Sequence, residues 1–261
     1  MIYHILGPRG TFTELALNSF MKDEQKIIYH HTIEETLKHV DENSLGLVPI
    51  ENTMEGYVLS TIDHIYQNQL KIIDDIYLDI EFICVYQDII HQDKTLYVQF
   101  AAKSQCSDFI SKKGFKHIIY TESNTTSYEY FIKDPIHNVA IIPKHTKHAY
   151  HSEDILLPNI KNQTRFVIVS KNHQEKEKDQ YKVFMVLTPK KDYPGLLYDI
   201  LGYFKDAKIN LSSIISRPMK QVIGIYHFYI SCEVSKTEYQ SILKLEHNIS
   251  DAYNLTILGC Y

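Results

Sequence analysis

The chain has 261 residues, of which 44% are hydrophobic and 23% charged, and its formal net charge is -5. This length can bury one large core or two modest ones, so we expect two domains or a two-lobed domain with an appended module. Net negative charge disfavours nucleic-acid binding, which usually needs a concentrated basic face. No apolar run approaches the roughly 20 residues of a membrane-spanning helix, and the N-terminus lacks the pattern of a secretory signal. We therefore expect a cytoplasmic protein that binds neither nucleic acid nor a membrane.

Cysteine and arginine are used sparingly. The four cysteines are scattered without a Cys-x-x-Cys pair, which is typical of buried free thiols in a reducing cytosol. Only Arg9, Arg165 and Arg217 are arginines among the 27 basic residues. Where lysine supplies the generic positive charge, a retained arginine indicates a planar fork for carboxylate recognition, although chance placement is the plain alternative.

The first part of the chain alternates short apolar strands with helices, the rhythm of parallel strands joined by crossover helices. Thr11 with Glu14, and Thr32 with Glu35, match the capping-box pattern that starts a helix. In chain order we expect strand 2–6, a helix after Thr11, strand 27–30, a helix from Thr32 to 40, strand 45–49 and a helix at 59–66.

After Asp79 the pattern restarts as a second lobe. We expect strands at 82–85, 96–98, 116–120 and 139–142, helices at 104–113 and from about Thr126, and a last strand at 165–170 that returns to the first lobe. The predicted lobe 1 covers about 1–78 plus 152–172, and lobe 2 covers about 79–151. Ligands of such folds bind at the carboxyl ends of strands, between the lobes.

A charged stretch without apolar periodicity, 171–180, marks the domain boundary. Beyond it we expect a strand at 181–187, a helix at 195–204, strands at 211–216 and 224–231, a helix at 236–247 and a strand at 255–259. That βαββαβ order is typical of a ferredoxin-like unit.

Two segments of the first lobe place polar groups where a strand ends. Segment 7–14 joins a strand, a glycine-containing turn and a helix start, so its backbone N–H groups can bind an anion. Segment 48–56 crowds Glu51, Asn52, Thr53 and Glu55 into a turn closed by glycine. The alternatives are a plain strand-to-helix turn and a polar loop that caps the next helix.

Two further segments carry hydroxyl groups. In segment 162–166, Thr164, Arg165 and Phe166 combine a hydroxyl, an isolated guanidinium and a ring, which suits a carboxylate on an unsaturated ring; an ordinary strand start is the alternative. Segment 124–126 begins a helix after a strand and can line a cleft, but capping by Thr126 with Glu129 explains it equally well.

No motif indicates a metal or nucleotide site. His145, His148 and His151 are spaced by three, which aligns them on a helix face, but without a zinc signature and with lysines between them they indicate a solvated face. Glycine-rich nucleotide motifs, a P-loop lysine and Gly-x-Ser-x-Gly are absent from the sequence.

Taken together, these segments resemble the prephenate dehydratase family over essentially the whole chain. Segments 7–12, 49–56 and 164–166 are similar to three motifs of that family, with Thr53 where serine is more usual. The last unit resembles an ACT domain of the phenylalanine-responsive kind. The residues that match its effector site are Gly195, Leu196, Leu197, Asn210, Leu211, Ser216, Arg217 and Pro218.

The chain departs from the family pattern at three places. Ile215 stands where the effector motif normally has glutamate, and Leu196 where alanine is common. Segment 99–102 reads Gln-Phe-Ala-Ala where the family usually has His-Pro-Gln-Ala, ahead of the retained Gln105 and Cys106. No catalytic role is carried over from segment 99–102.

The resemblance implies an α/β fold, with a two-lobed, periplasmic-binding-protein-like catalytic domain at 1–172 and a ferredoxin-like ACT domain at 181–261. It implies decarboxylating dehydration of prephenate to phenylpyruvate, carbon dioxide and water, without a metal or organic cofactor. It also implies feedback inhibition by L-phenylalanine, with the effector site between two copies of a homodimer or homotetramer. An arogenate dehydratase and a non-catalytic small-ligand-binding protein remain the alternatives.

The chemistry of prephenate assigns expected roles to the motif residues. Thr164 is placed at the leaving hydroxyl, and Glu55 is the rival proton source if the cleft raises its pKa. Arg165 would hold a carboxylate and Phe166 would shape an apolar wall. The residues expected to orient the substrate are Thr11, Asn52, Thr53 and Thr125.

Overall fold

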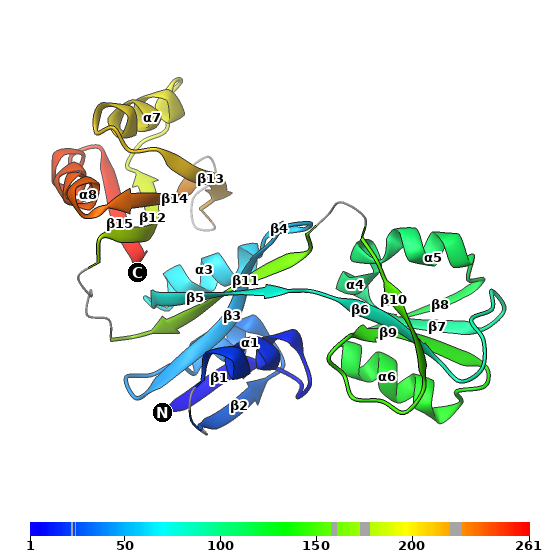
Figure 1. Ribbon diagram of the computed structural model, residues 1–261. Helices are drawn as coiled ribbons and strands as arrows, with labels where there is room; N and C mark the ends of the chain where they lie inside the picture. The colour runs from blue at the N-terminus through cyan, green and yellow to red at the C-terminus, as the bar shows by residue number, and fades with distance from the viewer. Residues whose placement is uncertain (22, 24, 158–160, 173–177, 220–225) are drawn as a thin grey trace. The chain divides into compact units, whose positions relative to one another are not determined.

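The computed structural model describes residues 1–21, 23, 25–157, 161–172, 178–219 and 226–261 (Figure 1). They form two compact units. Unit 1 comprises Met1–His64 and Asp75–Ile168, and unit 2 comprises Ile65–Asp74 and Val169–Tyr261. Parts of the predicted linker 171–180 and of the predicted strand 224–231 lie outside the described residues.

The first sheet of unit 1 has the strand order β5-β11-β3-β1-β2, and a short β4 pairs with β3. The strands are β1 (Ile2–Leu6), β2 (Lys26–His30), β3 (Ser44–Asn52), β4 (Gly56–Tyr57), β5 (Lys71–Asp79) and β11 (Gln163–Ser170). β1 is parallel to both β2 and β3, as the alternating pattern predicts. The predicted return of the last strand is confirmed, because β11 lies between β5 and β3. The sequence missed β5.

Three helices, α1 (Phe12–Phe20), α2 (Ile33–Lys38) and α3 (Leu59–Gln67), follow strands of this sheet. The Thr11 and Thr32 side chains accept hydrogen bonds from the amides of Glu14 and Glu35, which confirms both predicted caps. A capping box also predicts that each glutamate accepts from the backbone N–H of the capping threonine, and this part of the prediction was wrong. Each glutamate instead accepts from the residue before the cap, at 2.5 Å from Gly10 N and 3.1 Å from His31 N.

The second sheet of unit 1 has the order β10-β6-β9-β7-β8. Its strands are β6 (Phe82–Tyr86), β7 (Thr95–Gln99), β8 (His117–Thr121), β9 (Asn138–Pro143) and β10 (His151–Ile155), and its helices are α4 (Phe100–Gln105), α5 (Ser107–Lys113) and α6 (Asn124–Lys133). β7 runs parallel to β8 and β9. Every residue of β9 is buried, as expected for a central strand covered on both faces.

Two expectations for this lobe need correction. β10 pairs with β6, so residues 152–155 belong to the second sheet, whereas the sequence placed 152–172 in the first lobe. The helix face expected for His145, His148 and His151 was wrong, because a turn follows β9 and His151 begins β10.

Unit 2 contains the βαββαβ order predicted from the sequence. The elements are β12 (Gln180–Pro189), α7 (Leu196–Asp206), β13 (Leu211–Pro218), β14 (Tyr226–Ser235), α8 (Lys236–Asn248) and β15 (Tyr253–Cys260). Its antiparallel strands follow the order β13-β14-β12-β15. Residues of α7 and α8 share one hydrophobic core with alternate residues of β12, so both helices cover the same face of the sheet (Figure 1).

Within unit 2, β15 also meets the first residues of β5 in a parallel pair of Gly259 with Ile72. A Cβ atom at position 259 would lie 2.7 Å from Ile72 Cβ and 2.8 Å from Ile72 O. These separations are shorter than real Cβ contacts, so the close approach of the two strands requires glycine here.

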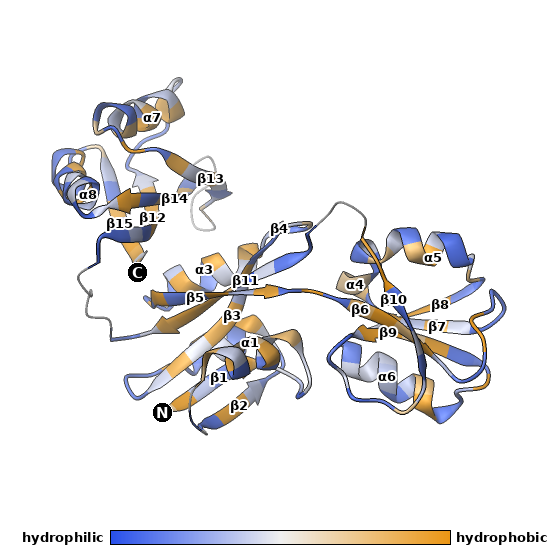
Figure 2. Cartoon of the chain, viewed as in Figure 1, coloured by the Kyte–Doolittle hydropathy of each residue, from blue (hydrophilic) through white to orange (hydrophobic). Residues whose placement is uncertain are grey.

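Apolar residues of both units collect on the strands, as the hydropathy colouring shows (Figure 2). The four cysteines (Cys84, Cys106, Cys232 and Cys260) are free and buried, which confirms that prediction. Burial raises the pKa of the Cys106 and Cys232 thiols to about 12. Thiols with such pKa values stay protonated and unreactive at neutral pH.

Candidate active site

The side-chain amide of Asn52, the last residue of β3, organises the first part of the site. Its Nδ2 donates to Thr164 Oγ1 at 2.9 Å and to Asn162 Oδ1 at 2.9 Å. Its Oδ1 accepts the backbone N–H groups of Met54 at 2.8 Å and Glu55 at 3.1 Å. The amide therefore orients Thr164 with one end and shapes the turn that carries Glu55 with the other.

Thr164 presents a hydrogen-bond donor. Its side chain is only 9% exposed, and its oxygen accepts from the Asn52 amide. Because that amide nitrogen can only donate, the hydroxyl hydrogen of Thr164 points elsewhere. In the described part of the chain no acceptor is assigned to it. A buried threonine held in this way can donate to a ligand oxygen.

Helix α4 of the second lobe reaches both parts of this site. Gln105 Oε1 accepts a 2.7 Å hydrogen bond from Asn162 Nδ2, which extends the network of Asn52 and Thr164. Ser104 Oγ, one residue earlier, donates to the exposed Glu55 carboxylate. Adjacent residues of α4 therefore contact Glu55 directly and the Thr164 network through Asn162.

Arg165 lies on the other face of the sheet from Thr164, because side chains alternate along β11. Its Nε is 3.0 Å from Asp75 Oδ2, and its Nη1 is 3.7 Å from Glu51 Oε2. The guanidinium carbon is 6.0 Å from the centroid of the Tyr77 ring. The side chain is 11% exposed, so in this structure the charge of Arg165 is largely matched by two carboxylates. Its role as a substrate carboxylate ligand stays a prediction.

The side chains of Phe166 and Thr53 contact other residues of the chain: Phe166 packs in the core, and Thr53 forms hydrogen bonds. Phe166 is buried, 2% exposed, on the same strand face as Thr164. Thr53 Oγ1 donates to Lys161 O at 2.7 Å and accepts from Gln163 N at 3.0 Å. These contacts pin the turn after β3 to the start of β11.

The loop between β1 and α1 contacts the second lobe. Thr11 caps α1 and also donates to Leu6 O at 3.3 Å. Gly10 has a φ of +86°, a conformation that favours glycine. Thr125 Oγ1, from the first turn of α6, donates to Arg9 O at 3.2 Å. The structure therefore brings the predicted residues Thr11 and Thr125 to the same junction between the lobes.

The start of α6 differs from expectation. The cap is Ser123, whose side chain accepts from the amide of Thr126, so the predicted cap at Thr126 was wrong. Asn124 Nδ2 donates to Gln99 Oε1 at 2.7 Å, and Gln99 Nε2 donates to the carbonyl of Glu122 at 3.4 Å.

Sequence reasoning assigned no role to three residues of this network: Asn162, which lies in the candidate segment 162–166, Gln105 and Asp75. Asn162 was visible two residues before Thr164, and Gln105 was noted as retained, but neither carries a pattern that points to the other. Asp75 lies in β5, which was not predicted. These contacts join residues more than 50 positions apart, and only the fold brings them together.

The predicted effector residues of unit 2 divide between the two ends of α7. Gly195, with a φ of +93°, caps the start of the helix, where Leu196 is buried and Leu197 is exposed. α7 has 11 residues, so it is roughly 16 Å long. Asn210 and Leu211 follow its far end, while Ser216, Arg217 and Pro218 end the strand that runs back. One small ligand cannot contact Gly195 and Asn210 of the same chain.

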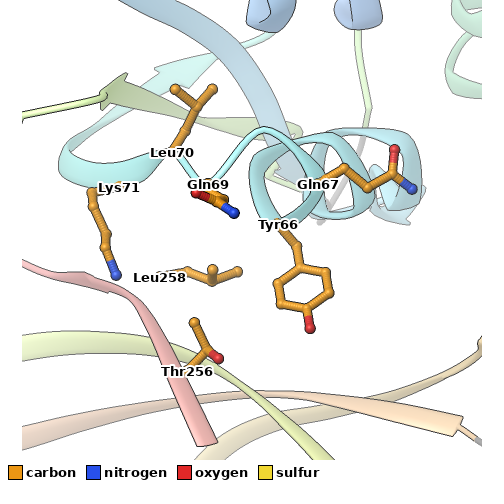
Figure 3. Close-up of a pocket in the computed structure, with 7 residues that line it drawn as sticks. All are labelled: Tyr66, Gln67, Gln69, Leu70, Lys71, Thr256 and Leu258. Carbon is orange, nitrogen blue, oxygen red and sulfur yellow. The ribbon is translucent and has the colours of Figure 1, made fainter. Parts of the chain in front are cut away.

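A separate cavity of about 690 Å³ lies in unit 2, between the end of α3 and β15 (Figure 3). Its lining residues are Tyr66, Gln67, Gln69, Leu70, Lys71, Thr256 and Leu258. The ammonium of Lys71 donates to Ile257 O. None of the predicted effector residues lines this cavity, so it is distinct from the predicted effector site.

Two negative findings apply to the described ranges. They contain no group of three or more His, Cys, Asp or Glu side chains placed to hold a metal ion. They also contain no helix whose length and hydropathy would allow it to cross a membrane.

Two α/β lobes with a polar network between them define a periplasmic-binding-protein-like domain, here followed by a ferredoxin-like unit. The sequence profile of prephenate dehydratase matches residues 3–174. The prephenate dehydratase of Methanocaldococcus jannaschii is 34% identical over 263 residues, which cover 97% of this chain and 95% of the relative. The chain belongs to the prephenate dehydratase family.

Solved structures agree over the whole chain. The prephenate dehydratase of Staphylococcus aureus superimposes with a TM-score of 0.84 at 28% identity and covers 100% of this chain and 99% of its own. The prephenate dehydratase of Arthrobacter aurescens, solved in complex with L-Phe, gives a TM-score of 0.86 at 27% identity, with coverage of 100% and 90%.

Proposed function

We propose that this chain converts prephenate into phenylpyruvate, carbon dioxide and water, and that Thr164 serves the leaving hydroxyl. The observation that carries the proposal is the buried Thr164 hydroxyl, whose oxygen is held by Asn52 while its hydrogen remains available. Family membership supplies the reaction, and the geometry supplies a donor in the motif where the reaction needs one.

The reaction balances with a single added proton. The bond between the ring and its carboxylate breaks, carbon dioxide leaves, and the electron pair enters the ring. The ring becomes aromatic as the C4–oxygen bond breaks, and the departing hydroxyl takes the proton and leaves as water. Hydroxide is a poor leaving group, so a positioned acid contributes roughly 10²–10⁴-fold to the rate.

Thr164 acts by donating a hydrogen bond or relaying a proton, because a threonine hydroxyl is a very weak acid. Glu55 is the second candidate for the proton source. Its carboxylate is exposed and held by Ser104 of the second lobe, while its backbone is held by Asn52. Asn52 therefore contacts both candidate proton sources, the side chain of Thr164 and the backbone of Glu55.

The remaining motif residues are proposed to orient the substrate. Asn52 and Thr53 act by shaping the turn after β3, and Thr11 and Thr125 act from the junction between the lobes. For Arg165 to hold a substrate carboxylate, its guanidinium must be shared with Asp75 and Glu51. Phe166 supports the Thr164 face from the core.

We further propose that residues 1–172 form the catalytic domain and 181–261 an ACT domain that binds L-phenylalanine between two copies. The separation of Gly195 and Asn210 along α7 supports this arrangement, because a second copy can supply the distant half of the site. The outer face of α7 exposes Leu197, Tyr198 and Leu201, and β13 is an edge strand. Exposed apolar side chains beside an open edge favour pairing of copies. The protein acts in the cytoplasm as a homodimer or homotetramer.

The assay that tests the function uses the purified chain with prephenate and with arogenate in parallel, following the ultraviolet absorbance of the aromatic product. We expect turnover of prephenate that is lost in Thr164→Ala. Faster turnover of arogenate would reassign the substrate. Binding of prephenate without turnover by the unaltered chain would make it a binding protein and overturn the proposal.

A further inference from the structure

Asn124, the first residue of the ten-residue helix α6, has an unpaired oxygen. Its side chain is 7% exposed, and Oδ1 is the one buried side-chain nitrogen or oxygen in the described ranges that lacks a hydrogen-bond partner. Buried polar atoms are almost always paired, and leaving an acceptor unpaired destabilises the folded state. An unpaired amide oxygen next to Thr125 is therefore a specific feature of the candidate site.

Gln99 determines which end of the Asn124 amide is unpaired. Its Oε1 accepts from Asn124 Nδ2 at 2.7 Å, while its Nε2 donates to the carbonyl of Glu122 at 3.4 Å. Turning the Asn124 amide would set two oxygens against each other. Turning both amides would set Gln99 Oε1 against the Glu122 carbonyl. The backbone at Glu122 therefore keeps the oxygen of Asn124, and not its nitrogen, as the unpaired end.

The two amides lie in the same lobe junction as the proposed chemistry. Thr125, beside Asn124, donates to Arg9 O across that junction. Gln99 caps α4, and Gln105 at the end of α4 accepts from Asn162, which is bonded to the Asn52 amide that holds Thr164. α4 thus connects the Asn124 amide to the Thr164 network. Gln99 also stands where the family usually has histidine, so this amide pair belongs to the chain's own departure from the family pattern.

Only one group of prephenate can donate a hydrogen bond to an unpaired acceptor such as Asn124 Oδ1. At neutral pH its two carboxylates and its keto group can only accept hydrogen bonds, and the ring hydroxyl is its single donor. We propose that Asn124 Oδ1, oriented by Gln99, accepts the hydrogen of that ring hydroxyl. This inference rests on the proposed function, because it takes prephenate as the substrate. It adds Asn124 to the catalytic residues and Gln99 as its positioning residue.

The proposed contact strengthens during the reaction. As the leaving oxygen takes up a proton and becomes water, its hydrogens become stronger donors, so a fixed acceptor stabilises the transition state more than the bound substrate. Thr164 donates to this oxygen and Asn124 accepts from it, which together set its orientation. Since Oδ1 is enclosed in this structure, the Asn124 and Gln99 side chains must move together toward the substrate, which keeps the 2.7 Å hydrogen bond that orients the amide.

The test compares Asn124→Leu, which removes the acceptor, with the unaltered chain and with variants of the positioning residue and of a control asparagine. With prephenate we expect kcat of Asn124→Leu to fall about 100-fold, the scale of one lost transition-state hydrogen bond. Gln99→Leu frees the amide to turn and should cost roughly 10-fold. The control is Asn138→Ala, a buried asparagine of the same lobe whose amide donates to Tyr130 O at 3.4 Å; its kcat should match the unaltered chain.

Product inhibition separates a contact with the hydroxyl from a structural role. Phenylpyruvate lacks the ring hydroxyl, so its inhibition constant should be the same in Asn124→Leu and in the unaltered chain. A parallel change in phenylpyruvate binding would show that Asn124 holds a water or the backbone, and would overturn the proposal. Additive losses in the double variant with Thr164→Ala would also overturn it, because two contacts to one oxygen must be coupled. Turnover of prephenate by the unaltered chain verifies the function independently.

Discussion

The two regions of this protein that matter most for function are built in opposite ways. Around Thr164, side chains from the end of β3, from β11 and the residue before it, and from α4 form a hydrogen-bonded network within one chain. Around α7, the residues of the predicted effector site lie at opposite ends of the helix, and apolar side chains remain exposed. The first region is therefore suited to chemistry in a single subunit, whereas the second, as we propose, takes its other half from another copy.

The contrast follows from the strand patterns. β11 is buried at almost every position, so its polar side chains must find partners inside the protein. β13 alternates between half-buried and exposed residues and has no fully buried one, so its side chains lie at or near the surface.

The largest expected effect comes from breaking the catalytic region at Thr164. In Thr164→Ala the leaving hydroxyl loses its donor, so kcat should fall about 10²–10⁴-fold, with little change in KM. Thr164→Ser keeps both the hydroxyl and the acceptor for Asn52 and should retain most of the turnover. The measurement is steady-state formation of phenylpyruvate. Near-normal turnover in the alanine variant would remove Thr164 from the chemistry.

Two adjacent residues of α4 sharpen the comparison within the catalytic region. Gln105→Leu removes the partner of Asn162 and should lower kcat roughly 10- to 100-fold through the Thr164 network. Ser104→Ala releases the Glu55 carboxylate and should cost less than that. Both variants lie on the same helix, so they control for each other in thermal stability. A larger loss in Ser104→Ala would make Glu55 the principal proton source.

The regulatory region is tested by mixing subunits. Gly195→Leu and Asn210→Ala should each raise the phenylalanine concentration for half-inhibition about 10-fold, the size of one lost contact, without changing uninhibited turnover. Refolding the two variants together should restore part of the inhibition, because one interface then combines an intact Gly195 half with an intact Asn210 half. Mixtures that stay as insensitive as the single variants would place the whole site within one chain.

The smallest expected effect is on the stability of unit 1, which should depend on pH through a cluster of histidines. His4 and His30 share a 2.8 Å hydrogen bond, and the His39 ring stacks 4.7 Å from that of His30. Burial, followed by the neighbouring histidines, lowers the pKa of His4 and of His30, while Asp41 opposes the shift of His4 and Glu35 that of His30. The unfolded chain then binds more protons than the folded one, so unit 1 loses stability as pH falls below about 6.5.

Calorimetry from pH 8 to pH 5 measures this loss. The unfolding transition of unit 1 should move to lower temperature as pH falls, and His30→Gln should reduce the movement. His117→Gln changes an exposed histidine of the same unit and serves as the control. An equal pH response in His30→Gln and the unaltered chain would exclude the cluster as the cause.

Much of the fold followed from local patterns. Helix starts at Thr11 and Thr32, the βαββαβ order and the buried thiols were all predicted, because caps and apolar periods depend on neighbours in the chain. The failures have equally local reasons. Asp74 and Asp75 interrupt the apolar pattern of β5, and the polar β10 lies at the edge of its sheet, so neither segment resembles a strand.

By itself, the sequence determined the family, the motifs that carry the chemistry and most of the order of elements, with β5 and β10 missed. Only the tertiary structure decided which of those residues act together. Thr164 and Arg165 are neighbours in the chain, yet strand alternation sends one to Asn52 and the other to Asp75. Asn124 and Gln99 are 25 positions apart, yet they form one amide pair with a single unpaired oxygen. Chemistry depends on distances of a few ångströms, and the register of packed strands and helices sets those distances.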